Sequence, residues 1–242
     1  MILKVVISRY GMKGVLLQWP ARIDEAILRE MTQFIQNIQH GQEEIANIHH
    51  AYHEVLIQYK NNIEAFSNLK IYLKNVLVGQ KKSTLPKATL WFIPVCYDEI
   101  LAPDLSMYLE QKEINLAQLI ALHTESIYTI YFTGFLPGFL YMGGLDNKLA
   151  IDRKSNPSRL VKKGTVAIGG SQTGVYPQDS PGGWYGIGYT PISFFDAAKK
   201  VPTWSKTGDK IQFLSVTQDE IKSVENEIEK GTYAIKSSPY ES

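Results

Sequence analysis

The sequence contains a single cysteine, Cys96, among 242 residues. A disulfide within the chain is therefore impossible, and a zinc or iron–sulfur site built on cysteines is not expected. The scarcity favours a reducing, intracellular compartment, so we expect a cytoplasmic protein. The histidines cluster only at His49, His50 and His53. Because neighbouring residues of a strand point to opposite faces, we expect no metal site there.

The sequence also lacks an excess of either charge. It has 25 Lys and Arg against 24 Asp and Glu, which gives a formal net charge of +1. Such a balance provides no field for duplex nucleic acid or for an anionic membrane surface, so neither is expected as a partner. With 44% hydrophobic and 20% charged residues, the composition is that of a foldable globular protein.

Long uninterrupted apolar helices are missing as well. Residues 126–145 carry no charge, but Gly134, Pro137, Gly138, Gly143 and Gly144 interrupt them. We therefore predict a strand, a tight turn and a second extended segment rather than a membrane span. The short apolar run at residues 1–7 predicts a strand and not a signal peptide.

Two nucleotide-binding sequence motifs are present only in part, and each lacks a required glycine. The sequence Gly79-Gln80-Lys81-Lys82-Ser83 is similar to the end of a P-loop, but Lys74 stands where its first glycine belongs. Pro191 replaces the third glycine of the dinucleotide motif that Gly186 and Gly188 would begin. Neither motif is therefore predicted.

The first third of the chain predicts an α+β domain. Apolar residues recur every three or four positions over residues 23–38 and 63–77, which indicates two amphipathic helices. Strands are expected at residues 2–7, 14–19, 45–51, 54–59 and 89–96. From residue 14, the order strand–helix–strand–strand–helix–strand is typical of a ferredoxin-like domain, with 1–85 as its bounds.

The remainder, residues 86–242, has a different character. Short helices are expected at 104–111, 115–124 and 218–230. Twelve of the 18 glycines fall between Gly134 and Gly188. Short strand-forming pieces at 128–133, 165–169, 184–189 and 211–216 lie between these turns. Many short strands with Gly and Pro turns indicate a β-barrel or a sandwich.

The candidate chemistry lies in the glycine-rich region. Glycine lets the backbone approach a ligand closely, and interspersed polar or aromatic side chains orient it. The candidates for ligand binding are Pro137, Gly138, Phe139, Tyr141, Ser180 and Trp184. Turn formation and core packing in a small barrel are the alternative role of this region.

Four residues are the candidates for catalysis: His123, Arg153, Gln172 and Tyr176. Arg153 lies in a basic stretch, and no acid occurs between Asp152 and Asp179, so it is suited to a carboxylate or phosphate. His123 is a candidate general base, with capping of carbonyls at a helix end as the alternative.

At these residues the sequence resembles the allophanate hydrolase subunit 1-like family. The resemblance is carried by residues 134–145 (GFLPGFLYMGGL), 165–177 (TVAIGGSQTGVYP), 180–184 (SPGGW) and Thr190-Pro191. It extends upstream to residues 93–97, 103–105 and 123–124. Where the family pattern has a second arginine this chain has Ser158, with Arg159 beside it.

The resemblance implies a ferredoxin-like N-terminal domain and a cyclophilin-like β-barrel. It further implies a subunit of a bacterial ATP-dependent 5-oxoprolinase, which opens the lactam of 5-oxo-L-proline to L-glutamate. The implied partners are a subunit 2 homologue (PxpC-like) and a PxpA-like protein, and ATP is bound by the complex. No nucleophile–base pair is evident in this chain, so we expect it to be inactive alone.

Two alternatives from the same family remain open. One is an inhibitor that binds a sensor histidine kinase through the turn at residues 134–141. The other is a carboxyltransferase or allophanate hydrolase-type subunit, which requires a biotin carrier.

Overall fold

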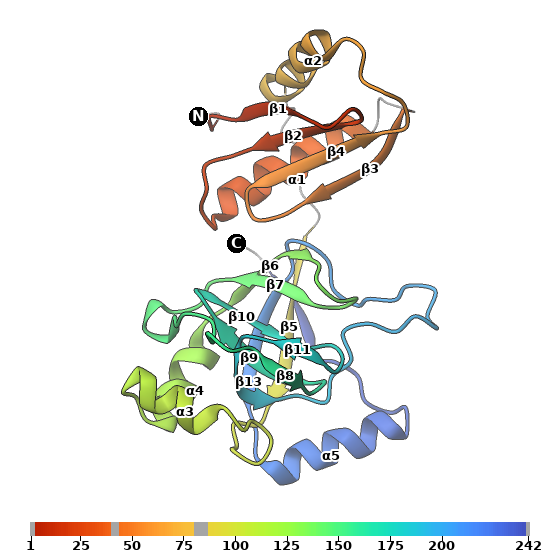
Figure 1. Cartoon of the computed structure of the whole chain (residues 1–242). Coiled ribbons are helices and arrows are strands. Elements are labelled where there is room, and N and C mark those ends of the chain that lie inside the picture. Colours follow the sequence, from red (N-terminus) through yellow and green to blue (C-terminus); the bar gives the residue numbers. More distant parts are fainter. Residues whose placement is uncertain (1–2, 40–43, 80–86, 241–242) are drawn as a thin grey trace. The chain divides into compact units, whose positions relative to one another are not determined.

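The computed structural model describes residues 3–39, 44–79 and 87–240. The chain divides into two compact units, Met1–Pro86 and Lys87–Ser242 (Figure 1). Both units mix helices with sheets, so the predicted α+β class is confirmed at this level.

The first unit is one antiparallel sheet with two helices. Its elements are β1 (Val6–Tyr10), β2 (Gly14–Gln18), α1 (Glu25–Gln39), β3 (Ile45–His50), β4 (Glu54–Tyr59) and α2 (Phe66–Val78). The sheet order is β1-β2-β4-β3. Helix α1 buries Ile27, Met31, Phe34 and Ile38 completely, at the intervals of three and four that predicted it.

The ferredoxin-like arrangement of this unit is not confirmed. Strands β2 and β3 run in the same direction with β4 between them, as in a split βαβ motif. However, residues 89–96, expected as the last strand of this sheet, pair within the second unit. Strand β1 occupies the free edge of β2 instead, through a hairpin that pairs Tyr10 with Gly14. The hairpin turn contains Gly11 at φ +63°, a conformation that glycine adopts without strain.

The second unit begins with β5 and contains three helices. Its elements are β5 (Ala88–Val95), α3 (Leu105–Lys112), α4 (Leu116–Glu125), β6 (Tyr128–Thr133), β7 (Leu140–Gly143), a 3₁₀ turn η1 (Asn147–Leu149), β8 (Ser158–Val161), β9 (Thr165–Gly169), β10 (Gln172–Val175), β11 (Ser180–Gly182), β12 (Tyr185–Tyr189), β13 (Lys210–Ser215), α5 (Gln218–Glu229) and β14 (Ser237–Tyr240).

In the described part of this unit, residues 87–240, the strands form three sheets. Their orders are β14-β5-β13-β6-β7, β10-β9-β12 and β11-β8. Isolated bridges between Cys96 and Tyr189 and between Ile151 and Gly170 extend the pairing between neighbouring segments. Among the described strands the pairing does not close into a continuous barrel, so the predicted cyclophilin-like barrel is not confirmed.

The uncharged stretch at residues 126–145 forms strands β6 and β7 with a turn between them, as predicted. In the described part of the chain, no helix has the length and apolarity needed to cross a membrane.

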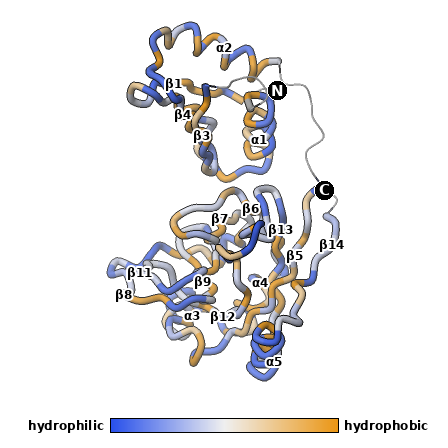
Figure 2. The backbone as a smooth tube through the Cα atoms, turned by 90° about the vertical axis from the view of Figure 1, so that its right-hand side faces the viewer, coloured by the Kyte–Doolittle hydropathy of each residue, from blue (hydrophilic) through white to orange (hydrophobic). Residues whose placement is uncertain are grey.

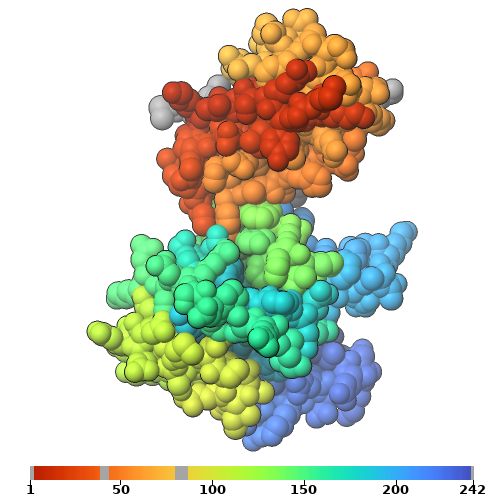
Figure 3. Space-filling model, in the orientation of Figure 1, coloured from red at the N-terminus to blue at the C-terminus, as the bar shows by residue number. Residues whose placement is uncertain are grey.

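The core of this unit lies between its two larger sheets and the helices. Tyr128, Ile93 and Phe213 are fully buried there, from β6, β5 and β13. Helix α3 packs against β12 and α4 against β13. Figure 2 shows much of β5 as hydrophobic and α5 as largely hydrophilic, which fits a surface helix. The segment between β12 and β13, light blue in Figure 3, projects from the body of the unit.

Candidate functional site

The turn between β6 and β7 forms one wall of the candidate site. Gly138 has φ +88°, and a Cβ there would lie 2.7 Å from the Cβ of Phe195, so this position admits only glycine. Phe135 takes the left-handed conformation at φ +63°, although it is not a glycine. Its ring remains 62% exposed and contacts Phe139 edge-on. The turn therefore holds an exposed aromatic ring in a backbone conformation that costs energy.

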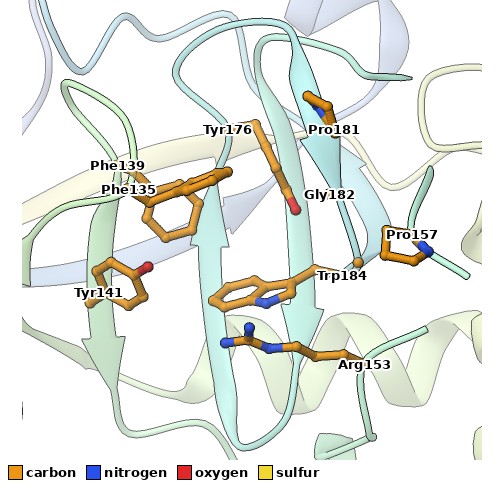
Figure 4. A pocket seen from close by; sticks show the side chains of 10 residues that line it. Phe135, Phe139, Tyr141, Arg153, Pro157, Tyr176, Pro181, Gly182 and Trp184 are labelled. Carbon is orange, nitrogen blue, oxygen red and sulfur yellow. The ribbon is translucent and has the colours of Figure 1, made fainter. Parts of the chain in front are cut away.

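Beside this turn lies a pocket of about 270 Å³. Ten residues from four parts of the second unit line it: Phe135, Phe139, Tyr141, Arg153, Pro157, Tyr176, Pro181, Gly182, Gly183 and Trp184 (Figure 4). Ligand pockets for drug-sized molecules span roughly 300–1,000 Å³, so this one suits a smaller ligand.

The walls are aromatic rings packed edge to face. The Phe139 ring lies 5.5 Å from Trp184, 5.8 Å from Tyr176 and 5.0 Å from Tyr141, centroid to centroid. Such edge-on contacts are favourable because a ring's positive edge meets a negative face. The cluster also buries Val161 and Ala167 beneath it.

Two glycines make room for these rings. A Cβ on Gly169 would lie 2.4 Å from the Trp184 ring, and one on Gly182 would lie 2.2 Å from the Tyr176 hydroxyl. The density of glycine in the sequence is thus explained at these positions by close approach to the pocket wall and not by turn formation.

Arg153 supplies the positive charge of the pocket. Its guanidinium carbon lies 5.6 Å from the centre of the Trp184 ring, a cation–π distance (Figure 4). Arg153 is exposed, and within the described residues its guanidinium has no ion pair or hydrogen bond. Its donors therefore remain available for a ligand carboxylate or phosphate.

Tyr176 supplies a hydroxyl proton. The backbone N–H of Trp184 lies near the phenolic oxygen, and among the described residues the hydroxyl proton has no acceptor, so it is left to donate to a ligand. Burial raises the pKa of Tyr176 above its ordinary value, although the Trp184 bond and the Arg153 charge oppose this. The hydroxyl is consequently protonated at neutral pH and acts as a donor.

The pocket thus offers hydrogen-bond donors and flat apolar walls. None of the residues that line it within the described chain carries a carboxylate, an imidazole, an aliphatic hydroxyl or a thiol. It can hold and orient a small planar acid but does not contain a general base of its own.

His123 lies outside this pocket, in the core. Its ring is fully buried, with Nδ1 2.7 Å from the Tyr97 hydroxyl and Nε2 3.0 Å from the Thr173 hydroxyl. The Thr173 hydroxyl donates to the carbonyl of Ala167, so its oxygen accepts from His123 Nε2 and Nδ1 accepts from Tyr97. Burial lowers the pKa of His123 to about 3. The predictions of a base near neutral pH and of a carbonyl cap do not fit this geometry.

The other candidates are divided between three places. Arg153 and Tyr176 share the pocket with Phe139, Tyr141 and Trp184. Pro137 and Gly138 line a separate hollow of about 360 Å³ on the other side of the turn. The Ser180 hydroxyl is buried and donates to the carbonyl of Pro181.

Gln172 lies near the pocket without lining it. It pairs with Gly169 across the β9–β10 ladder, and directly opposite residues share a face. A side chain on Gly169 would meet Trp184, so Gln172 projects on the side of that indole. Its amide oxygen is buried with no hydrogen-bond partner among the described residues.

Sequence reasoning missed five lining residues: Phe135, Pro157, Pro181, Gly182 and Gly183. Four of them lie within the sequence runs at 134–145 and 180–184 that carried the family resemblance. Their place in such a run was the available signal, and Pro157 is the proline that the family pattern has directly before its second arginine.

Comparison with known families decides the assignment. Residues 5–205 match the family described as carboxyltransferase domain, subdomain C and D. The chain belongs to this carboxyltransferase-domain family. The match covers the pocket and all ten of its lining residues.

Members of known name are similar over about half of the chain. The B subunit of the Bacillus subtilis 5-oxoprolinase is 37% identical over 135 residues, which are 56% of this chain and 56% of that protein. The protein of the same name from Haemophilus influenzae is 43% identical over 122 residues, 50% of this chain and 57% of that one. The matches thus span little more than half the length of these relatives.

Similarity to solved structures covers more of the chain than the sequence matches do. The crystal structure of TTHA0988 superposes with a TM-score of 0.73 and 26% identity, over 85% of this chain and 40% of that one. The Kluyveromyces lactis urea amidolyase gives a TM-score of 0.81 over 99% of this chain and 16% of that one. At 17% identity the second likeness shows the fold alone.

Proposed function

We propose that this member of the carboxyltransferase-domain family is a subunit of an ATP-dependent 5-oxoprolinase. The reaction takes 5-oxo-L-proline, ATP and water to L-glutamate, ADP and phosphate, and it breaks the C–N bond of the lactam. The similarity to the B subunits of known 5-oxoprolinases supports this assignment.

The observation that carries the proposal is the placement of Arg153 and Tyr176 in one small aromatic-walled pocket. The substrate is a flat five-membered ring with one carboxylate and one carbonyl oxygen. Arg153 is suited to the carboxylate, and the Tyr176 hydroxyl to the carbonyl oxygen, where its hydrogen bond polarises the C=O bond. The aromatic rings match the faces of the lactam ring.

The chain is proposed to be inactive alone. The lining residues include no carboxylate, imidazole or thiol to activate water, so that group must come from another polypeptide. We propose as partners a subunit 2 homologue (PxpC-like) and a PxpA-like protein. We also propose that ATP binds to the assembled complex, because a pocket of about 270 Å³ fits a lactam better than a whole nucleotide.

For the fold of the second unit we propose that its sheets correspond to an opened cyclophilin-like barrel. The bridges at Cys96–Tyr189 and Ile151–Gly170 support this, since they link β5 to β12 and the end of β9 to the segment after η1. For the first unit, the split βαβ arrangement of β2, β4 and β3 is the part of a ferredoxin-like domain that is present.

The test is reconstitution. The purified chain is combined with the two companions, and ADP release is measured with and without 5-oxoproline. We expect ATP turnover that depends on 5-oxoproline only in the complete set. Failure of the complete set to cleave 5-oxoproline, with each component folded, would overturn the proposal.

Carboxyl transfer is the second candidate, favoured by the family description itself and by the fold shared with urea amidolyase. Adding a biotinylated carrier protein to the same assay separates the two functions. Turnover that requires the carrier and is indifferent to 5-oxoproline assigns the chain to carboxyl transfer.

A further inference from the structure

Lys154, the residue that follows Arg153, differs from it in burial and in its contacts. Arg153 is exposed, whereas the side chain of Lys154 is only 9% exposed. The Lys154 ammonium lies 2.6 Å from Asp104 Oδ2 and 2.9 Å from the Ser158 hydroxyl. It also lies 5.4 Å from the centre of the Tyr185 ring. Lys154 is therefore an anchor for the segment that carries Arg153.

Asp104 joins three elements at this anchor. It immediately precedes α3, but its side chain makes no capping bond to that helix. Its Oδ2 instead accepts from Lys154 and from the backbone N–H of Gly186 in β12, at 3.0 Å. One carboxylate thus fixes the start of a helix, a strand and the segment after Arg153.

The anchor reaches Arg153 and Trp184 through their covalent neighbours. The backbone N–H of Lys154 donates to the carbonyl of Gly183 at 2.8 Å. Lys154 is the covalent neighbour of Arg153, and Gly183 is the neighbour of Trp184. One backbone hydrogen bond therefore joins the covalent neighbours of the two residues that make the cation–π contact, Arg153 and Trp184.

We propose that Asp104, acting through Lys154, positions Arg153 over Trp184 for the ligand carboxylate. Arg153 has no polar partner of its own among the described residues, so the backbone on either side must fix where its side chain begins. Removing one member of a mostly buried ion pair leaves the other uncompensated, and that strongly disfavours the native placement. Asp104 is then a positioning residue and touches no ligand itself.

The test uses the full chain without ligand and follows the Nε–H group of Arg153 by NMR. In the wild-type protein we expect an ordered group, and in Asp104→Asn an order parameter that falls below about 0.6. Asp179→Asn is the matched control, because it breaks the exposed Lys162–Asp179 pair at 2.9 Å, in which neither Arg153 nor Lys154 takes part. An Arg153 signal as ordered in Asp104→Asn as in the wild type would overturn the proposal.

A milder variant covers the case in which Asp104→Asn does not fold. Ser158→Ala removes one hydrogen bond from Lys154 but retains the ion pair. We expect a smaller fall in the same order parameter, and no fall at all would contradict the positioning role.

A second readout rests on the proposed function. We expect Asp104→Asn to weaken binding of 5-oxoproline about tenfold and to leave binding of 2-pyrrolidinone, which lacks the carboxylate, unchanged. In an Arg153→Ala background, we expect Asp104→Asn to weaken the binding of 5-oxoproline no further. If the wild type binds no 5-oxoproline, the proposed function fails while the NMR result still decides the role of Asp104.

Discussion

At the scale of single residues, the pocket is defined by two groups whose donor protons have no acceptor among the described residues. Arg153 lies over the Trp184 ring, and the Tyr176 hydroxyl stays protonated because burial raises its pKa, so both present protons to the cavity. Their ligand must therefore supply acceptors at two points, one of them charged. Ligands that lack one of these acceptors should therefore distinguish the contribution of Arg153 from that of Tyr176.

Tyr176→Phe removes the proposed donor to the lactam carbonyl. We expect kcat/KM to fall about five- to tenfold, because a single hydrogen bond contributes roughly 1 kcal/mol. The loss should be equal for 5-oxoproline and 2-pyrrolidinone, since both carry the carbonyl. Steady-state kinetics of the reconstituted enzyme measure this, and a loss seen with only one of the two compounds would be inconsistent with the assigned role.

Gly182→Ala tests the fit of the aromatic wall. The added Cβ would lie 2.2 Å from the Tyr176 hydroxyl, so the ring must move. Overpacking of this kind typically costs about 1–3 kcal/mol, and we expect that loss in the free energy of unfolding. Gly183→Ala is the control, because there a methyl group meets nothing closer than 3.8 Å. Equal stability of the two variants in chemical denaturation would show that Gly182 has no such constraint.

At the scale of elements, His123 connects α4 to β10 and to the segment after β5. Hydrogen bonds run from Tyr97 to His123, on to Thr173 and then to the carbonyl of Ala167 in β9. Ala167 packs beneath the pocket rings. The neutral imidazole is therefore a structural element that supports the pocket from the core.

This arrangement predicts a pH dependence of stability. Burial lowers the folded-state pKa of His123 to about 3, against about 6.5 when unfolded. Between these values the unfolded chain binds one proton more, so stability is full above pH 6.5 and falls as the pH drops toward 3. We expect the slope between pH 4.5 and 6 to approach 1.4 kcal/mol per pH unit from this residue alone.

The check is urea unfolding of the wild type and of His123→Phe across that range. The variant should lose this part of the slope, whereas the exposed-site control His49→Phe should keep it. Parallel curves for wild type and His123→Phe would refute the assignment.

Local pattern predicted most elements of the structure but not every pairing. The spacing of apolar residues placed α1, and Asn115 marked the start of α4, where it forms a capping box. The local sequence pattern could not show that β5 pairs in the second unit and not with β2, because its partners β13 and β14 lie more than 100 residues away in the sequence. Strands β8, β10, β11 and β14 were missed, since they are only three or four residues long.

The site was predicted in part for a similar reason. Residue type indicated Arg153 and Tyr176 as ligand-binding groups, and the structure brings them to one pocket. Residue type also favoured His123, but only the packing around it shows that both ring nitrogens are occupied. The Asp104–Lys154 pair joins residues 50 positions apart, which no local pattern reveals.

At the scale of the whole molecule, the pocket is proposed to be one part of a larger reaction centre. Binding groups are present, and a group that activates water is not among its lining residues. This division explains why the family resemblance implies companion subunits. In this proposal the chain contributes recognition of the substrate, and its partners contribute the remaining chemistry.

Arg153 is proposed to recognise the substrate carboxylate in this pocket. The most direct test of this proposal is the ratio of kcat/KM for 5-oxoproline to that for 2-pyrrolidinone, measured in the reconstituted enzyme with wild-type and Arg153→Gln chains. A hydrogen bond to a charged group contributes about 1.5–3 kcal/mol, so we expect the wild type to prefer 5-oxoproline by at least tenfold. The Arg153→Gln enzyme should show a ratio near unity, and an unchanged preference in that variant would contradict the account.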